Sequence, residues 1–303
     1  MEESGSSTWK LVLSYDGSSF YGWQVQPGLP TVQGELRAAI ARVAGETVLP
    51  QGSGRTDAGV HALGQVASFT LSAPIPEANL LRALNRILPP AIRVTGARRV
   101  PADFHARHSA LAKTYEYRIF RGKICPPWLA RYVYADGGHL DWEAMARASE
   151  SVIGEHDFTS FAASDAGADE KPDSPAGNAA PSHPAAAQKD RGAPPQANVR
   201  TIHCSEWLLE EGAGEMPDGA FAGACGDGAN RNGELLTYRV RGSGFLHHMV
   251  RNLVGVFLEI GRGRFPADSV PEILAARTRS AAGPTAPARG LFLCRVEYPG
   301  RLS

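Results

Sequence analysis

Apolar and polar positions follow two different periods along the first third of the chain. Apolar side chains occupy every second position over 9–15, which predicts a strand. They recur at three- and four-residue spacing over 32–43 and 80–87, which predicts two helices, the second stopped by Pro89-Pro90. The segments expected to be extended are a strand near 46–50 and strands at 64–71 and 92–100. The resulting order is β-α-β-β-α-β.

The rest of the chain repeats that order. A helix is opened by Asp141 and closed by Gly154, and the apolar stretch 245–260 fits a buried helix with Gly261 as its glycine C-cap. The remaining elements are a shorter helix over 266–278 and strands at 111–121, 198–209, 234–242 and 291–298. Two split β-α-β units predict an α+β protein of two ferredoxin-like halves, 1–107 and 108–303. The local pattern does not say how the halves pair.

Two stretches break the pattern of a folded domain. Residues 164–197 contain no Leu, Ile, Val or aromatic residue, and 211–233 are rich in Gly, Ala and Asp. Segments of this kind bury too little apolar surface to offset the entropy that ordering removes. We expect both to be disordered or mobile insertions in the second half.

The composition is that of a soluble globular protein, with 303 residues, 43% of them apolar and 20% charged. No apolar run is long enough to span a membrane, and the polar residues 1–8 lack the apolar core of a secretory signal. The four cysteines lie far apart, so neither a zinc site nor a disulfide framework is indicated. These features favour a cytoplasmic protein without a membrane partner.

The stretch 52–62 carries the clearest candidate chemistry and reads Gly-Ser-Gly-Arg-Thr-Asp-Ala-Gly-Val-His-Ala. It places Asp57 close to Arg55 and among glycines, which suggest tight backbone geometry or the close approach of a ligand. A cation near Asp57 would lower the pKa of its carboxyl, and an ionised carboxylate in a cleft can be a nucleophile, a base or a metal ligand. A surface turn with a local Asp–Arg pair is the alternative.

This motif closely resembles the signature of the bacterial TruA-type tRNA pseudouridine synthases around their catalytic aspartate. The other segments similar to that family occur in the same order and are Asp-Phe-His-Ala-Arg at 103–107, Lys-Thr-Tyr-Glu-Tyr-Arg at 113–118, Asp-Phe-Thr-Ser-Phe at 157–161 and Gly-Phe-Leu-His-His-Met-Val-Arg-Asn at 244–252. The resemblance implies that the sheets of the two halves join around a central active-site cleft, and that the protein is a homodimer.

The resemblance also implies an isomerase that converts uridine to pseudouridine in the tRNA anticodon stem-loop, at about positions 38–40. The reaction needs no redox change and loses no atoms, so no cofactor is expected. The implied catalytic nucleophile is Asp57. Attack at C1′, addition to C6 and base-assisted glycal formation all stay open as routes.

Two further catalytic roles follow from the resemblance. Arg55 would assist flipping of the target base or serve as a charge partner of Asp57, and Tyr115 would stack on the flipped uracil. The strand period by itself favours a core position for Tyr115, because Tyr117 and Ile119 share its face.

Other candidates for substrate binding lie outside the main motif or at its end. Arg251 could pair with Asp57 and keep it ionised, and Leu246 could close the apolar side of the pocket. His61 is grouped with them, with a structural hydrogen bond in the Asp57 loop as its expected role. The arginines considered for phosphate or base contacts, with solvated surface as the default, are Arg82, Arg86, Arg107, Arg262 and Arg264.

Two histidine pairs, 247–248 and 105/108, invite a metal interpretation. Because carboxylate partners and the regular spacing of a metal site are missing, structural or RNA-contacting histidines are favoured and no metal is expected.

A net charge of zero is unusual for a protein that binds RNA. The stretches 164–197 and 211–233 carry −2 and −3, which leaves +5 on the remainder. Two rival functions remain. A non-catalytic tRNA-binding or tRNA-folding protein would lack a functional Asp57, and a metal-dependent phosphodiesterase would need a second acidic cluster that the sequence does not show.

Overall fold

The computed structural model describes residues 5–163, 197–213 and 233–300. The predicted insertions at 164–197 and 211–233 lie outside these residues except at their ends. Within the described ranges no helix has the length and apolar character needed to cross a bilayer.

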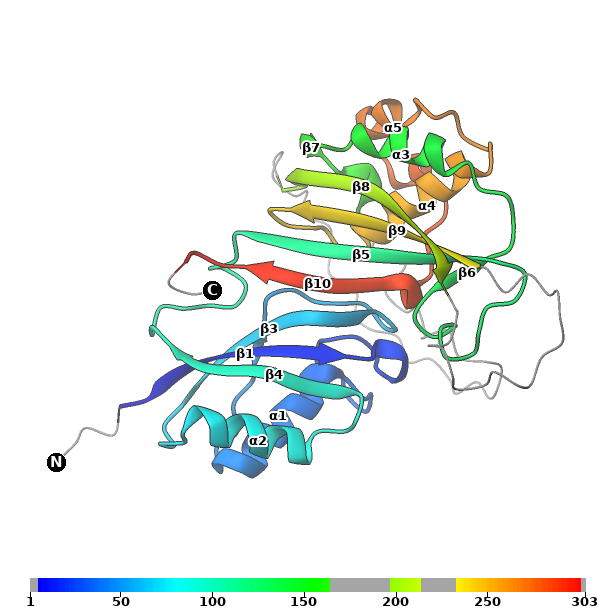
Figure 1. Cartoon of the computed structure of the whole chain (residues 1–303). Coiled ribbons are helices and arrows are strands. Elements are labelled where there is room, and N and C mark those ends of the chain that lie inside the picture. Colours follow the sequence, from blue (N-terminus) through cyan, green and yellow to red (C-terminus); the bar gives the residue numbers. More distant parts are fainter. Residues whose placement is uncertain (1–4, 164–196, 214–232, 301–303) are drawn as a thin grey trace, which may run out of the picture.

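The described strands form one ten-stranded sheet with the order β4-β1-β3-β10-β5-β9-β8-β7, and β2 and β6 attach to β3 and β5 (Figure 1). Their bounds are β1 Ser7–Tyr15, β2 Gln51–Gly52, β3 His61–Leu71, β4 Ile92–Val100, β5 Ala112–Arg121, β6 Tyr134–Asp136, β7 Gly154–Asp157, β8 Val199–Ala213, β9 Gly233–Gly242 and β10 Leu291–Glu297. Each half shows the ferredoxin-like order of fourth, first, third and second strand, as β4-β1-β3-β2 and β10-β5-β9-β8. The predicted α+β class is confirmed.

The last strand joins the two halves. β10 pairs antiparallel with β5 and in parallel with the start of β3, where Phe292 lies opposite His61. β1 occupies one edge of β3. The opposite edge is shared by two strands, because β10 pairs with the start of β3 and β2 pairs with its other end, where Gln51 lies opposite Ser68. The Asp57 loop, residues 53–60, leaves β2 and enters β3 between these two pairings.

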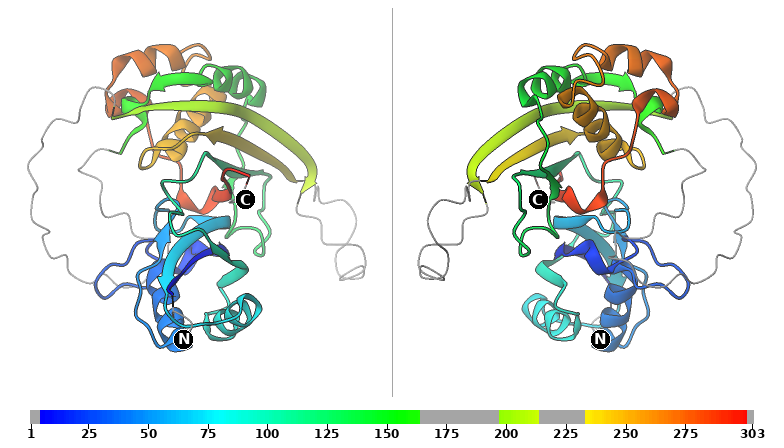
Figure 2. Two further views of the ribbon diagram at one scale, coloured as in Figure 1. Left: turned by 90° about the vertical axis from the view of Figure 1, so that its left-hand side faces the viewer. Right: turned by 90° about the vertical axis from the view of Figure 1, so that its right-hand side faces the viewer.

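The helices gather at the two ends of the molecule. α1 (Val32–Ala44) and α2 (Glu77–Ile87) belong to the first half, and α3 (Trp142–Glu150), α4 (Met249–Gly261) and α5 (Val270–Ala276) belong to the second. Figure 2 shows the long β8 and β9 curving together along the second half. α4 is the core of that half, since each of its residues is buried.

Several predicted boundaries are wrong for local physical reasons. Residues 46–50 form no strand, because the ladder with β3 involves only Gln51 and Gly52. Asp141 does cap α3, accepting a hydrogen bond from the amide of Ala144, but that helix ends at Glu150 and not at Gly154. The helix expected from 245 begins at Met249, because His248 is left-handed with φ 61°. Gly261 is the last residue of α4, not its cap.

Candidate active site

The Asp57 loop is anchored to the strand that follows it. The amide of Ser53 donates to the carbonyl of Val66 at 2.8 Å, and its hydroxyl donates to Oε1 of Gln65 at 2.7 Å. The side-chain Nε2 of Gln65 donates in turn to the carbonyl of Gly54 at 3.0 Å. Ser53 and Gln65 are fully buried, so these bonds fix the first turn of the loop.

A second clamp comes from the segment after β1. The amide of Trp23 donates to the carbonyl of Thr56 at 3.0 Å, directly before Asp57. Gly22 has φ 82°, and a Cβ there would lie 2.5 Å from the same carbonyl, so only glycine fits this approach. The Thr56 hydroxyl is 2.8 Å from that of Tyr15. The backbone on the N-terminal side of Asp57 is therefore held before any substrate arrives.

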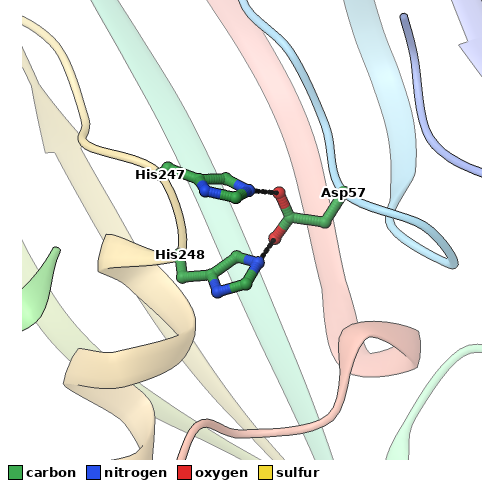
Figure 3. Close-up of side chains that lie close together, drawn as sticks. All are labelled: Asp57, His247 and His248. Atoms are coloured by element: carbon green, nitrogen blue, oxygen red, sulfur yellow. Dashed lines mark ion pairs between the residues drawn. The ribbon is translucent and has the colours of Figure 1, made fainter. Parts of the chain in front are cut away.

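The Asp57 carboxylate meets three side chains of the second half. Its Oδ1 lies 3.2 Å from Nε2 of His247, and its Oδ2 lies 3.4 Å from Nε2 of His248 (Figure 3). Oδ2 also lies 3.2 Å from Nη1 of Arg251. The Asp57 side chain is 16% exposed, so this ion-pair cluster is largely shielded from water. The Asp57 loop and the partners of its carboxylate thus come from opposite halves.

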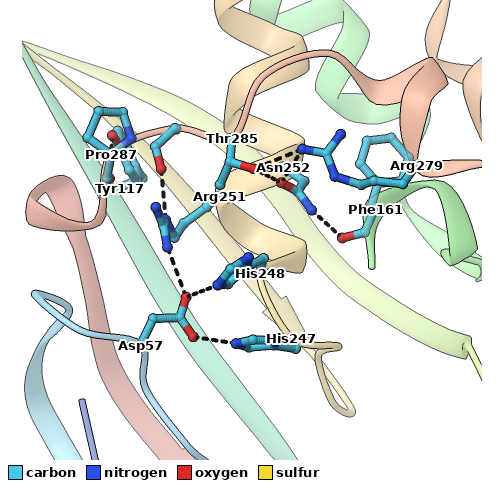
Figure 4. A network of polar contacts seen from close by, with 11 residues as sticks. Asp57, Tyr117, Phe161, His247, His248, Arg251, Asn252, Arg279, Thr285 and Pro287 are labelled. Atoms are coloured by element: carbon cyan, nitrogen blue, oxygen red, sulfur yellow. Dashed lines mark hydrogen bonds and ion pairs between the residues drawn. The ribbon is translucent and has the colours of Figure 1, made fainter. Parts of the chain in front are cut away.

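Arg251 is fixed in place by the chain around it. It is 3% exposed on the first turn of α4, and its Nε donates to the carbonyl of Ala286 at 2.8 Å (Figure 4). The amide of Ala286 donates back to the carbonyl of Arg251 at 3.1 Å. The next residue, Asn252, donates to the carbonyl of Phe161 at 2.8 Å. The cation therefore faces Asp57 with little freedom to move away.

The surroundings decide the charge of Asp57. Burial is the largest single influence and raises the pKa of its carboxyl. The hydrogen bond from His247 and the positive charges of His248 and Arg251 outweigh it, so the pKa is lowered overall. The same contact raises the pKa of His247 against the effect of burial. Asp57 is thus an ionised carboxylate at neutral pH.

Asp57, His247 and His248 could also hold a metal ion, since one ligand atom from each lies within 4.8 Å of the others. The expectation that the histidine pair lacks a carboxylate partner is therefore wrong, because tertiary structure supplies Asp57. Arg251 opposes such an ion, since its guanidinium already contacts the same carboxylate.

Comparison with known proteins bears on what this cluster does. The model of a family described as tRNA pseudouridine synthase matches residues 11–109 and 185–299. The chain belongs to that family. The matched ranges contain Asp57, His247, His248 and Arg251.

Individual relatives match over nearly the whole length. The protein named tRNA pseudouridine synthase A from Solibacter usitatus is 45% identical over 289 residues, covering 95% of this chain and 98% of the relative. Proteins of the same name from Moorella thermoacetica and Bacillus licheniformis are 40% and 38% identical, each with 95% of this chain and 98% of the relative covered.

Tyr115 lies in the core and interacts with the charged cluster. It is 7% exposed on β5, and its ring meets the edge of Phe245 with centroids 5.0 Å apart. Burial raises the pKa of its phenol most strongly, and the charges of Tyr15, Asp57 and Cys294 add to this. The phenol is therefore neutral, and the core position predicted from the strand period coexists with a place near Asp57.

The segment 243–248, here called the histidine connection, links β9 to α4. It carries Leu246, which is half-buried and packs against the hydrophobic core. His248 has a positive φ, an uncommon conformation for a residue other than glycine. Such backbone strain is typical of functional sites, and here it coincides with an imidazole placed against Asp57. No local sequence pattern indicates this left-handed turn.

Arg55 does not fill the place expected for a charge partner. Its side chain is exposed, and within the described residues it forms no ion pair with Asp57. Its charge instead lowers the pKa of His247, which places the guanidinium within electrostatic reach of that imidazole. The buried partner is Arg251.

His61 and Arg107 lie in contrasting environments. His61 is 1% exposed, its Nδ1 accepts from the amide of Gly17 at 3.1 Å, and its ring stacks on Phe292. The expected structural hydrogen bond is present, and the grouping of His61 with substrate contacts stays a prediction. Arg107 is exposed on the segment between β4 and β5.

Proposed function

We propose that this protein is a tRNA pseudouridine synthase that modifies uridine in the anticodon stem-loop, at about positions 38–40, with Asp57 as the nucleophile or base. The observation that carries the proposal is the ionised Asp57 carboxylate, held between a clamped loop and three partners from the other half. Membership of the tRNA pseudouridine synthase family supports the reaction class.

The reaction needs what this site offers. The bond between C1′ and N1 of uracil breaks, the base turns, and a bond between C1′ and C5 forms. The hydrogen on C5 leaves to solvent and N1 gains one, so atoms and electrons balance without a cofactor. A carboxylate can attack C1′, add to C6 of the base, or remove the C2′ proton to give a glycal. The lowered pKa of Asp57 keeps it ionised for each route.

The residues around Asp57 receive matching roles. Tyr115 would stack on the flipped uracil, and its neutral phenol avoids charge repulsion with Asp57. Leu246 would close the apolar side of the pocket. Arg55, exposed beside the site, would contact the RNA backbone as the target base leaves its stack.

One observation favours a second candidate, a metal-dependent phosphodiesterase. Asp57, His247 and His248 have the geometry of a three-ligand site. Such an enzyme would lose activity with a chelator, whereas the isomerase would not.

The test uses unmodified tRNA transcripts labelled with tritium at C5 of uridine. We expect the wild-type protein to release the label into water at an unchanged rate in EDTA, and the modified tRNA to carry pseudouridine at about positions 38–40. Strand cleavage that EDTA abolishes would support the phosphodiesterase. Tight tRNA binding without release or cleavage would support the non-catalytic binding protein.

We further propose that the protein acts as a homodimer in the cytoplasm. Cys125, Cys204 and Cys294 are free thiols, which suits a reducing compartment. Light scattering on the purified protein would give twice the 32.3 kDa of one chain if the dimer forms.

A further inference from the structure

Three cations converge beside the Asp57 loop, and the proposed reaction gives none of them a role. Arg107 precedes β5, Lys113 lies on β5 and Arg200 lies on β8. The charges of Arg107 and Arg200 lower the pKa of Lys113, and the charge of Arg107 lowers the pKa of Arg200, so the three lie within electrostatic reach. Among the ion pairs of the described residues, none joins a carboxylate to any of them. We call Arg107, Lys113 and Arg200 the three-cation cluster.

Lys113 connects the cluster to the Asp57 loop. Its Nζ donates to the carbonyl of Ser53 at 2.6 Å, and a Cβ added at Gly54 would lie 3.1 Å from the same nitrogen. Lys113 lies two positions before Tyr115 on β5, so both side chains leave the same face of the strand. The ammonium is thus placed on the face of the sheet that carries the candidate base-stacking tyrosine.

Arg200 connects the cluster to the histidine connection. Its Nη1 donates to the carbonyls of Ala197 and Val199 at 2.9 and 2.6 Å, which fixes the guanidinium by one of its nitrogens. A Cβ added at Gly244 would lie 3.6 Å from Cδ and Nε of Arg200. The guanidinium therefore lies beside the backbone that leads to His247 and His248.

Arg107 completes the cluster from the first half. Its neighbour Ala106 is fully buried, and the Ala106 amide donates to the hydroxyl of Ser68 at 3.0 Å. Ser68 pairs with Gln51 in the sheet, two residues before Ser53. The backbone under Arg107 is therefore anchored next to the start of the Asp57 loop, while its side chain is exposed.

Other arginines of the protein are neutralised. Arg262 pairs with Asp136, Arg264 with Glu259 and Arg241 with Glu297. Lys113 has no such carboxylate partner among the described residues. Burial and the charges of Arg107 and Arg200 lower its pKa to about 8. Unneutralised, partly buried cations that repel one another are stabilised by a bound anion.

We propose that Arg107, Lys113 and Arg200 form a binding site for a backbone phosphodiester of the RNA substrate, next to the Asp57 loop. This inference rests on the proposed function, because it takes the anion from the RNA that carries the target uridine. The bound phosphate would hold the RNA strand beside the Asp57 carboxylate. Lys113 would join the phosphate to the Asp57 loop through its hydrogen bond to the carbonyl of Ser53.

The test measures equilibrium binding of an unmodified tRNA transcript to the full-length protein at several KCl concentrations. The variants are Arg107→Gln, Lys113→Gln and Arg200→Gln, with Arg37→Gln as the control of equal charge change. Arg37 is exposed on α1 and forms no ion pair among the described residues. Each cluster variant should bind roughly tenfold more weakly. The slope of log affinity against log salt should become shallower by about 0.7–0.9.

A pH series isolates Lys113. The groups that face its ammonium are Arg107, Arg200 and the carbonyl of Ser53. Only the protonated amine attracts phosphate, so wild-type affinity should be full below about pH 8 and weaken above it. Lys113→Arg should bind tRNA with wild-type affinity at neutral pH and lose that alkaline decline. Thermal melts identify any variant that is unfolded, and the other two cluster positions then carry the test.

The outcomes separate this inference from the proposed function. Salt slopes equal to those of wild type and Arg37→Gln would overturn the phosphate site, even if wild type releases tritium from labelled tRNA. Shallower slopes in a protein that releases no tritium would keep the phosphate site and refute the synthase. An equal loss in Arg37→Gln would show a net-charge effect and overturn the site.

Discussion

The two halves have the same strand order but use their second strand differently. In the first half this strand, β2, has 2 residues, and the chain leaves the ladder to form the Asp57 loop. In the second half the equivalent strand, β8, has 15 residues and pairs along β9. In the first half the chain therefore leaves the sheet early and presents the Asp57 carboxylate. In the second half β8 stays paired with β9, and the sheet supports the residues that contact this carboxylate.

The second helices of the two halves, α2 and α4, differ in the same sense. α2 buries only Leu80 and Leu84 and leaves its other side to solvent. All residues of α4 are buried, including Arg251 and Asn252. A buried charge must be paired. Arg251, which is buried in the second half, finds its partner in Asp57, the candidate reacting carboxylate of the first half.

The largest effect is expected from Arg251→Met, which removes the buried partner of Asp57. The unfolding free energy should fall by about 3 kcal/mol, because the buried ion pair loses its cation and leaves Asp57 with the two histidines alone. The pKa of the Asp57 carboxyl should rise, so the acidic limb of the pH–rate profile should move to higher pH. Denaturant titration and tritium release across pH measure the two effects.

Arg37→Met on the exposed face of α1 is the control for that variant. Its stability should change by less than about 0.5 kcal/mol, and its acidic limb should stay in place. Equal stability losses in both variants would mean that the burial of α4 and the charge of Asp57 are not linked.

A smaller effect is expected from Gly255→Ala in α4. A Cβ at this position would overlap the carbonyl of Pro284, so overpacking should reduce stability by about 2 kcal/mol. Gly34→Ala in α1 is the matched change in the other half. There the added Cβ meets side chains and no backbone, the hydroxyl of Thr31 at 2.9 Å and Cγ2 of Val25 at 3.9 Å, and the gain in helix propensity offsets the closer contact. Comparable melting temperatures for the two variants would contradict the tighter packing of the second half.

The smallest effect is expected from His247→Gln, because its side chain is 60% exposed. Asp57 loses a hydrogen bond and a charge that lower its pKa, so the acidic limb should move to higher pH. Folding raises the pKa of His247, so its stabilising contribution is full below about pH 6.5 and disappears at alkaline pH. The melting-temperature difference from wild type should follow that course. A difference that grows with pH would contradict it.

Long elements with a clear period could be predicted from the sequence. β1, α1, α2 and β4 fall where the apolar spacing places them, and Asp141 caps α3 as its position indicates. β6 and β7 were missed because strands of three and four residues are too short to show a period. The pairing of β10 with β3 joins residues far apart in the chain, so no local pattern encodes it.

The site shows the same division. The motif at 52–62 marked Asp57, and the segment 244–252 marked Arg251 as a partner. Sequence proximity favoured Arg55 as the charge partner, whereas the buried partner, Arg251, lies 194 positions away. Lys113 was missed because its environment, a carbonyl at 2.6 Å and two arginines, exists only in the folded chain.

The most direct test of the central claim is tritium release from C5-labelled tRNA by Asp57→Asn, compared with wild type under single-turnover conditions. Asparagine keeps the shape of the side chain but removes the charge that Arg251, His247 and His248 surround. We predict that release falls by roughly 10⁴-fold while tRNA affinity stays within a few-fold of wild type. Release by Asp57→Asn at the wild-type rate would contradict the assignment of this carboxylate as the reacting group.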